Sequence, residues 1–127
     1  MNREELIEFI ESLNLPTEEF CVLSSGCLVL YGLRDVAGDL DLCVTPKLGE
    51  ELIKRYNLGE KDKWGNNFYH VNDNLEFIIE ENFEFEKVGE YQVETLENVL
   101  KFKKARQKKR DLEDVANIEK YLASKNN

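Results

Sequence analysis

Two carboxylates, Asp39 and Asp41, stand one residue apart in the segment "DLDLCV". Apolar residues alternate with them as in a half-buried strand, which sends both carboxylates to the same face. Like charges at this spacing repel each other, so water, a base or a metal cation must balance them. Carboxylate oxygens are the hard ligands that Mg²⁺ and Mn²⁺ prefer, so a metal site is the first chemistry that this pair predicts.

A third acid, Glu76, lies in the apolar segment "NLEFII". A carboxylate in a strand made for burial is costly unless it is paired or bound to a cation. Because metal sites of this kind recruit a further acid from another strand, we expect Glu76 to join Asp39 and Asp41 as a ligand. The alternative is that the short acidic pair is a solvated strand end, or that Asp39 pairs with Arg34.

A turn that suits phosphate precedes the acid pair. Ser24, Ser25 and Gly26 lie between a predicted strand (residues 20–24) and a predicted short helix (residues 27–33). Glycine lets the backbone approach a phosphate closely, the start of a helix favours an anion, and the two hydroxyl groups add donors. A phosphate cradle, a pair of acids and a third acid are together what metal-assisted phosphoryl transfer requires.

These motifs resemble the nucleotidyltransferase superfamily, which has the polymerase-beta-like fold. The segment "LYGLRDVAGDLDLCV" is similar to the "YG-R-x-DLDL" run of its abortive-infection (AbiEii-like) branch. The segment "LKFKKARQKKRDLEDV" resembles that branch's helical lysine followed by a helix with a basic-Asp-x-x-Asp pattern. The matching positions in this second segment are Lys103, Arg110, Asp111 and Asp114. Ser25 stands where the family's turn usually begins with glycine, and Glu76 where aspartate is commoner.

The resemblance implies transfer of a nucleoside monophosphate from a nucleoside triphosphate (NTP) to an acceptor hydroxyl on a protein, a small molecule or a tRNA end. The implied catalytic residues, which also hold Mg²⁺ or Mn²⁺, are Asp39, Asp41 and Glu76. The implied nucleotide-binding residues are Ser24, Ser25, Gly26, Arg34 and Lys103. For Arg34 we favour a structural ion pair, and the alternative for Lys103 is a solvated surface lysine. A toxin–antitoxin or phage-defence setting, with a cognate antitoxin or other protein partner, belongs to the same expectation.

Two other functions stay open from the sequence. One is a catalytically silent relative that binds a nucleotide or a protein, and its sign would be a Glu76 that lies far from the acid pair. The other is a plain interaction protein with solvated acids, and its sign would be the lack of any cleft beside Asp39. Trp64 either stacks a base or covers the sheet edge, and His70 in "FYHV" is expected to be structural.

The composition limits the class of protein. The 127 residues suit one domain (1–127), and no apolar stretch approaches the roughly 20 residues of a membrane span. The charged N-terminal segment is unlike a secretory signal, so we expect a cytoplasmic protein without membrane contact. The net charge of −9 argues against broad nucleic-acid binding. Residues 101–110 nevertheless hold seven basic and no acidic residues, which either attract phosphate or form a solvated helix face.

The elements that position these residues are expected to form an α+β fold. We predict a mixed sheet of about four to five strands with helices packed on it, in a core of about residues 18–94. Two helices follow in about residues 95–123, and their link is expected to come from Asp111 and Asp114. The apolar stripe predicted for the last helix comprises Leu112, Val115, Ile118 and Leu122. The three cysteines are expected to be buried, reduced thiols.

Overall fold

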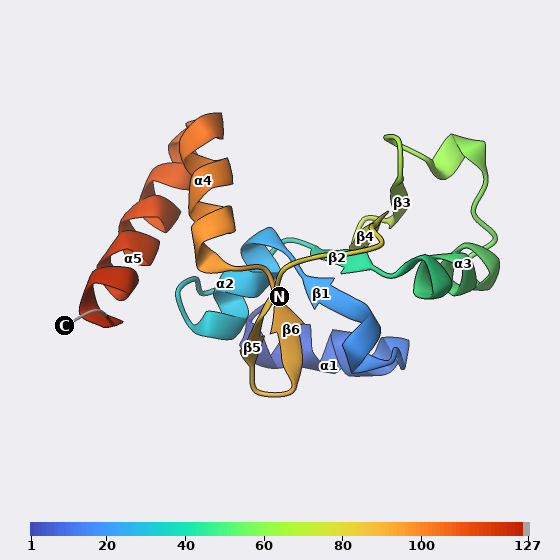
Figure 1. Cartoon of the computed structure of the whole chain (residues 1–127), viewed down its shortest axis with the longest axis horizontal. Helices are drawn as coiled ribbons and strands as arrows, with labels where there is room; N and C mark the ends of the chain where they lie inside the picture. The colour runs from blue at the N-terminus through green and yellow to red at the C-terminus, as the bar shows by residue number, and fades with distance from the viewer. Residues whose placement is uncertain (126–127) are drawn as a thin grey trace.

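The computed structural model describes residues 1–125, which form five α-helices and one six-stranded sheet (Figure 1). The helices are α1 (Arg3–Leu13), α2 (Ser24–Tyr31), α3 (Pro46–Arg55), α4 (Leu96–Arg106) and α5 (Lys109–Lys125). The strands are β1 (Phe20–Val22), β2 (Leu40–Val44), β3 (Phe68–Asn72), β4 (Leu75–Ile79), β5 (Glu86–Val88) and β6 (Tyr91–Val93). The expected α+β class is confirmed. Within residues 1–125, no helix has both the length and the apolar character needed to cross a membrane.

The sheet is mixed and has the strand order β3-β4-β2-β1-β6-β5. Strand β2 is antiparallel to β1 and parallel to β4, while β6 runs parallel to β1 on the other side. The sheet has one strand more than the upper end of our expectation, because β5 pairs with β6 at one edge. The missed strand, "EKV", is only three residues long and has one apolar side chain, so its sequence shows no alternation that would predict a strand.

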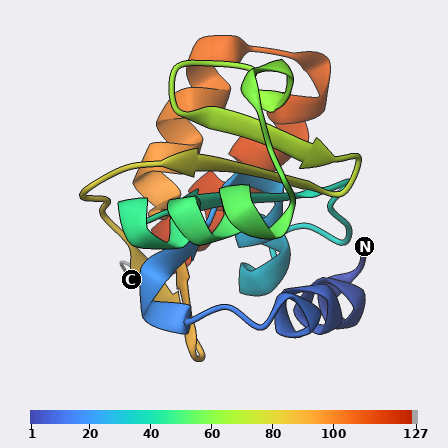
Figure 2. The same ribbon diagram turned by 90° about the vertical axis from the view of Figure 1, so that its right-hand side faces the viewer.

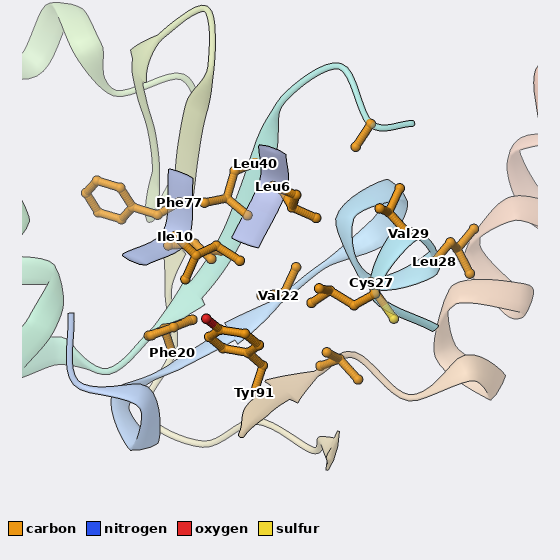
Figure 3. Close-up of a cluster of buried hydrophobic side chains, with 14 of the residues drawn as sticks. Leu6, Ile10, Phe20, Val22, Cys27, Leu28, Val29, Leu40, Phe77 and Tyr91 are labelled. Atoms are coloured by element: carbon orange, nitrogen blue, oxygen red, sulfur yellow. The ribbon is translucent and has the colours of Figure 1, made fainter. Parts of the chain in front are cut away.

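One face of the sheet carries the hydrophobic core. In the β2–β4 pair, Leu40 lies opposite Leu75 and Leu42 opposite Phe77, and these four side chains are buried. Figure 3 shows the α1 side chains of the core beside those of the strands and of α2, and its labelled residues are Leu6, Ile10, Phe20, Val22, Cys27, Leu28, Val29, Leu40, Phe77 and Tyr91. In Figure 2, α1 and α3 lie below β3 and β4, whereas the α4–α5 pair stands above and behind these two strands.

Alternation along the strands sends a second set of side chains to the opposite face of the sheet, which we call the site face. It includes Asp39 just before β2, Cys21 (β1), Asp41 and Cys43 (β2), Glu76 and Ile78 (β4) and Phe68 and His70 (β3). The cysteines, Cys27 of α2 included, are all buried and form no disulfide. The site face is therefore polar at one end of its strands and apolar at the other.

A buried charge cluster holds α4 and α5 together. Lys103 of α4 is only 2% exposed, and its Nζ lies 3.0 Å from Asp114 Oδ2 and 3.5 Å from Asp111 Oδ1 of α5. Arg106 donates two further hydrogen bonds to Asp111, which hold the pKa of that carboxyl well below its usual range. The expected link through Asp111 and Asp114 is thus present. The buried stripe of α5 begins with these two acids, and Leu112, which was expected in that stripe, is 64% exposed.

The cluster also fixes the loop between α2 and β2 (residues 32–39). Arg34 from this loop donates to Asp114, with 2.6 Å between Nη1 and Oδ2. On its other side the loop is held by the N-H of Ala37, which donates to the carbonyl of Met1 at 2.9 Å. The helical pair therefore positions the segment that leads into β2.

Replacing Lys103 by methionine tests this cluster. Lys103→Met keeps the apolar stem but leaves two buried carboxylates without the ammonium between them, so we expect the free energy of unfolding to fall by about 3 kcal/mol. Urea unfolding followed by circular dichroism measures the loss. Lys104→Met is the matched control, because Lys104 pairs with Glu119 at the exposed surface and its replacement should cost less than about 1 kcal/mol. Equal losses in the two variants would contradict the structural role of Lys103.

Candidate metal centre

Asp39, Asp41 and Glu76 meet on the site face. Each offers one carboxylate oxygen, and these three oxygens lie within 4.8 Å of one another. The strand register explains the meeting, since Asp41 and Glu76 are direct partners across the parallel β2–β4 pair and Asp39 immediately precedes β2. All three residues are half-buried. Three carboxylate oxygens at this spacing fit Mg²⁺ or Mn²⁺, which prefer hard oxygen ligands.

The surroundings of Asp41 and Glu76 disfavour the charged form of both carboxyls. Burial, followed by the negative charges of neighbouring carboxylates, raises the pKa of Asp41 from 3.8 to about 7. Burial and the contact with Asp39 likewise raise the pKa of Glu76, against the opposing influence of His70. The imidazole Nδ1 of His70 lies 3.8 Å from Glu76 Oε2. Because a divalent cation would remove this repulsion, the electrostatics favour a cation at the cluster.

The residues predicted to form a phosphate turn before a helix lie beside the cluster, but that prediction of a separate turn is wrong, because Ser24, Ser25 and Gly26 are the first residues of α2. The N-H of Leu23 donates to the carbonyl of Asp41 at 2.9 Å, which joins the start of α2 to the strand that carries the acids. Gly26 is buried, and a Cβ added to it would lie 2.9 Å from Val22 Cγ1. The glycine thus lets α2 pack closely on β1, and its contact with phosphate stays a prediction.

A carboxylate of the protein already occupies the start of α2. The N-H of Ser24, a residue in the left-handed conformation (φ 54°), donates to Glu94 Oε1 at 2.9 Å. The other oxygen of Glu94 accepts a hydrogen bond from the side-chain amide of Asn98. Strands β1 and β6 are parallel, so their carboxyl ends meet at one edge and bring Glu94 to the helix. The positive end of a helix favours a carboxylate for the same reason that it favours a phosphate.

The sequence did not identify Glu94 as a site residue. The available signal was an acid at the end of the predicted strand "EYQVE". Its meaning depends on the parallel pairing of β6 with β1, and an alternation pattern does not reveal which strands pair.

Arg34 and Lys103 make their contacts with α5. Arg34 pairs with Asp114, so the alternative in which it pairs with Asp39 is wrong. Lys103 is buried between Asp111 and Asp114, so the alternative of a solvated surface lysine is also wrong. The nucleotide contacts expected of both residues stay predictions, and they would require each cation to share or leave its carboxylate partners.

A hollow of about 370 Å³ lies farther along the site face than the acid cluster. Its lining includes Cys43 and Ile78, which follow Asp41 and Glu76 on the same face of β2 and β4. Glu94 also lines it. The volume falls within the range of small-molecule sites, but its lining does not include Asp39, Asp41 or Glu76, so the hollow is not a cleft at the acid cluster.

The chain was also compared with protein-family models, with curated proteins and with solved structures, and none of the three comparisons found a match. The functional conclusion therefore comes from the geometry of the site and from the motifs in the sequence.

The raised pKa of Asp41 predicts how the metal-free protein responds to pH. The stability that protonated Asp41 provides is complete below the unfolded pKa of 3.8 and is lost as the pH rises through about 7. Asp41→Asn removes this loss, so in EDTA we expect it to gain roughly 1–2 kcal/mol over the wild type at pH 8, after allowance for solvent screening. The gain should shrink toward zero at pH 4. Melting temperatures across this range measure it, with Asp35→Asn in the exposed loop as control; a gain that does not depend on pH would contradict the assignment.

Proposed function

We propose that the protein is a metal-dependent nucleotidyltransferase, which transfers a nucleoside monophosphate from an NTP to an acceptor hydroxyl. The observation that carries the proposal is the meeting of Asp39, Asp41 and Glu76 beside the start of α2. A cation site next to a helix N-terminus combines the two kinds of charge stabilisation that phosphoryl transfer needs. The acceptor is a protein, a small molecule or a tRNA end. The AbiEii-like motifs support a toxin–antitoxin or phage-defence setting, with an antitoxin as partner.

In this proposal the residues of the chain bind and orient the reactants. Asp39, Asp41 and Glu76 would hold Mg²⁺ or Mn²⁺, which when bound neutralises triphosphate charge and lowers the pKa of the acceptor hydroxyl. The acceptor oxygen bonds to the α-phosphorus while the bond from that phosphorus to the β-phosphate oxygen breaks, and pyrophosphate leaves with the electron pair. The hydroxyl proton passes to Glu76 or to water. Ser24 and Ser25 would donate hydrogen bonds to the β- and γ-phosphates.

The second candidate is a catalytically silent module that binds a nucleotide or a protein. It is favoured by one observation, namely that two groups expected to hold phosphate are bonded to the protein's own carboxylates. These groups are the N-H of Ser24, bonded to Glu94, and the ammonium of Lys103, bonded to Asp111 and Asp114. The position of Glu76 favours the enzyme, because a silent relative was expected to have this acid far from the pair.

Nucleotide and metal binding together test the first candidate. At saturating concentration, an NTP with Mg²⁺ or Mn²⁺ should raise the melting temperature by about 5 °C or more. Incubating a cell extract with each NTP labelled at the α-phosphate should give a labelled product, which identifies the acceptor class. Asp39→Asn should lose both effects, because it removes one ligand of the cation, whereas Asp35→Asn in the exposed part of the same loop should keep both.

Three outcomes of this experiment separate the candidates. Labelling that Asp39→Asn abolishes supports the enzyme. Binding without labelling in any extract supports the silent module. The absence of NTP binding, measured by calorimetry with the metal present, contradicts both nucleotide-binding candidates.

Removing the charge of Glu94 should strengthen phosphate binding. Glu94→Gln keeps an oxygen acceptor for Ser24 but withdraws the negative charge that competes with phosphate at the start of α2. We expect inorganic tripolyphosphate with Mg²⁺ to bind about threefold to tenfold more tightly. Isothermal titration calorimetry measures this change. Glu97→Gln, an exposed acid in the first turn of α4, is the control and should leave the affinity unchanged; a weaker affinity in Glu94→Gln would argue against phosphate at this position.

A further inference from the structure

A pair of stacked aromatic rings stands next to the acid cluster. The rings of Trp64 and His70 are parallel within 2°, with 3.8 Å between their centroids. Trp64 lies in the loop before β3, and its backbone N-H donates to the carbonyl of Phe68 at 2.9 Å, which ties the loop to the strand. Although one face of the indole rests on the imidazole, 62% of the residue is exposed. Trp64 thus presents a supported and accessible aromatic surface.

The strand register places this ring pair in line with the other parts of the site. In one row across the sheet, the N-H of Leu23 bonds to Asp41, Asp41 faces Glu76, and Glu76 faces His70. The row therefore runs from the start of α2 through two acids of the cluster to the imidazole, with Trp64 stacked on it. Strands β1, β2, β4 and β3 are successive neighbours, so the row spans three strand spacings, about 14 Å.

The order of these groups matches the order of groups along an NTP. The helix start suits the terminal phosphates, the acids with their cation suit the α-phosphate, and an exposed aromatic face suits a planar base. The aromatic pair also lies close to the acid cluster, because His70 Nδ1 is 3.8 Å from Glu76 Oε2. This nitrogen is buried and, within the described part of the chain, has no hydrogen-bond partner.

We propose that Trp64, supported from behind by His70, is the stacking surface for the base of a nucleotide whose phosphates bind at the acid cluster and the start of α2. This inference rests on the proposed function and adds the position of the base. Stacking uses the π-face that every base has, so the surface accepts purines and pyrimidines with little discrimination.

The experiment compares a ligand that has a base with one that lacks it. Calorimetry with Mg²⁺ measures the binding of a non-transferable ATP analogue, with a methylene group between the α- and β-phosphates, and of inorganic tripolyphosphate. Trp64→Ala should weaken the ATP analogue by about tenfold and leave tripolyphosphate unchanged, and Trp64→Phe should recover most of the loss. Phe102→Ala, which removes another exposed aromatic side chain on α4, is the matched control and should change neither affinity.

Fluorescence gives an independent readout, because Trp64 is the only tryptophan in the chain. With Mg²⁺ present, the ATP analogue should change the emission of the wild-type protein, and tripolyphosphate should change it much less. Circular dichroism and the melting temperature of each variant establish that it is folded before its affinities are compared.

The outcomes separate this inference from the proposed function. If the wild type binds neither ligand, the nucleotide site fails and the base position fails with it. If both ligands bind and Trp64→Ala binds the ATP analogue as tightly as the wild type, the stacking surface is overturned while the metal and phosphate site stands. If Trp64→Ala weakens tripolyphosphate as much as the ATP analogue, Trp64 acts through His70 and Glu76 instead of on the base, which also overturns the proposal.

Discussion

The register of β2 between β1 and β4 is the constraint on which both the core and the candidate site depend. Leu40 and Leu42 enter the core only if Asp41 faces the other way, because successive side chains of a strand alternate. A slip of one residue would drive carboxylates into the apolar layer and expose leucines, so the hydrophobic effect itself fixes the acids on the site face. The same register sets Asp41 against Glu76 and leaves its carbonyl to accept the N-H of Leu23. The packing of leucines in the hydrophobic core, on the other face of the sheet, thus brings the acids of the cluster together.

A second interaction, the burial of the Lys103 ammonium between two carboxylates, holds together the elements outside the sheet. Charges are rarely removed from water without compensation, and here Asp111 and Asp114 supply it. Because Asp114 also binds Arg34, the helical pair and the loop before β2 share one carboxylate. Under the proposed function, the family-like residues of the C-terminal segment act on the site indirectly, by holding the loop that ends at Asp39.

The sequence predicted the parts of this protein that depend on local pattern. The acid pair and the third acid were each visible as a residue type out of keeping with its neighbours, and the structure brings the three acids together. The failures concern features that a local hydrophobic pattern does not reveal. Strand β5 is too short to show a period. The position of Glu94 depends on the parallel pairing of β6 with β1. Leu112 is exposed because Asp111 and Asp114 are the residues of that part of α5 that face inward. The roles of Arg34 and Lys103 also depended on partners 80 and 8 residues away.

The contact between Glu94 and Ser24 has a consequence for selectivity among anions. An anion that binds the N-H of Ser24 must exchange with a carboxylate that is covalently part of the protein and therefore always present at high local concentration. A singly charged anion gains little from the exchange. A polyphosphate that arrives with its own divalent cation offers more charge to the helix and gives the displaced carboxylate a cation nearby. Such a helix end would ignore the chloride, bicarbonate and simple carboxylic acids that surround it and respond to the rarer, more highly charged ligand.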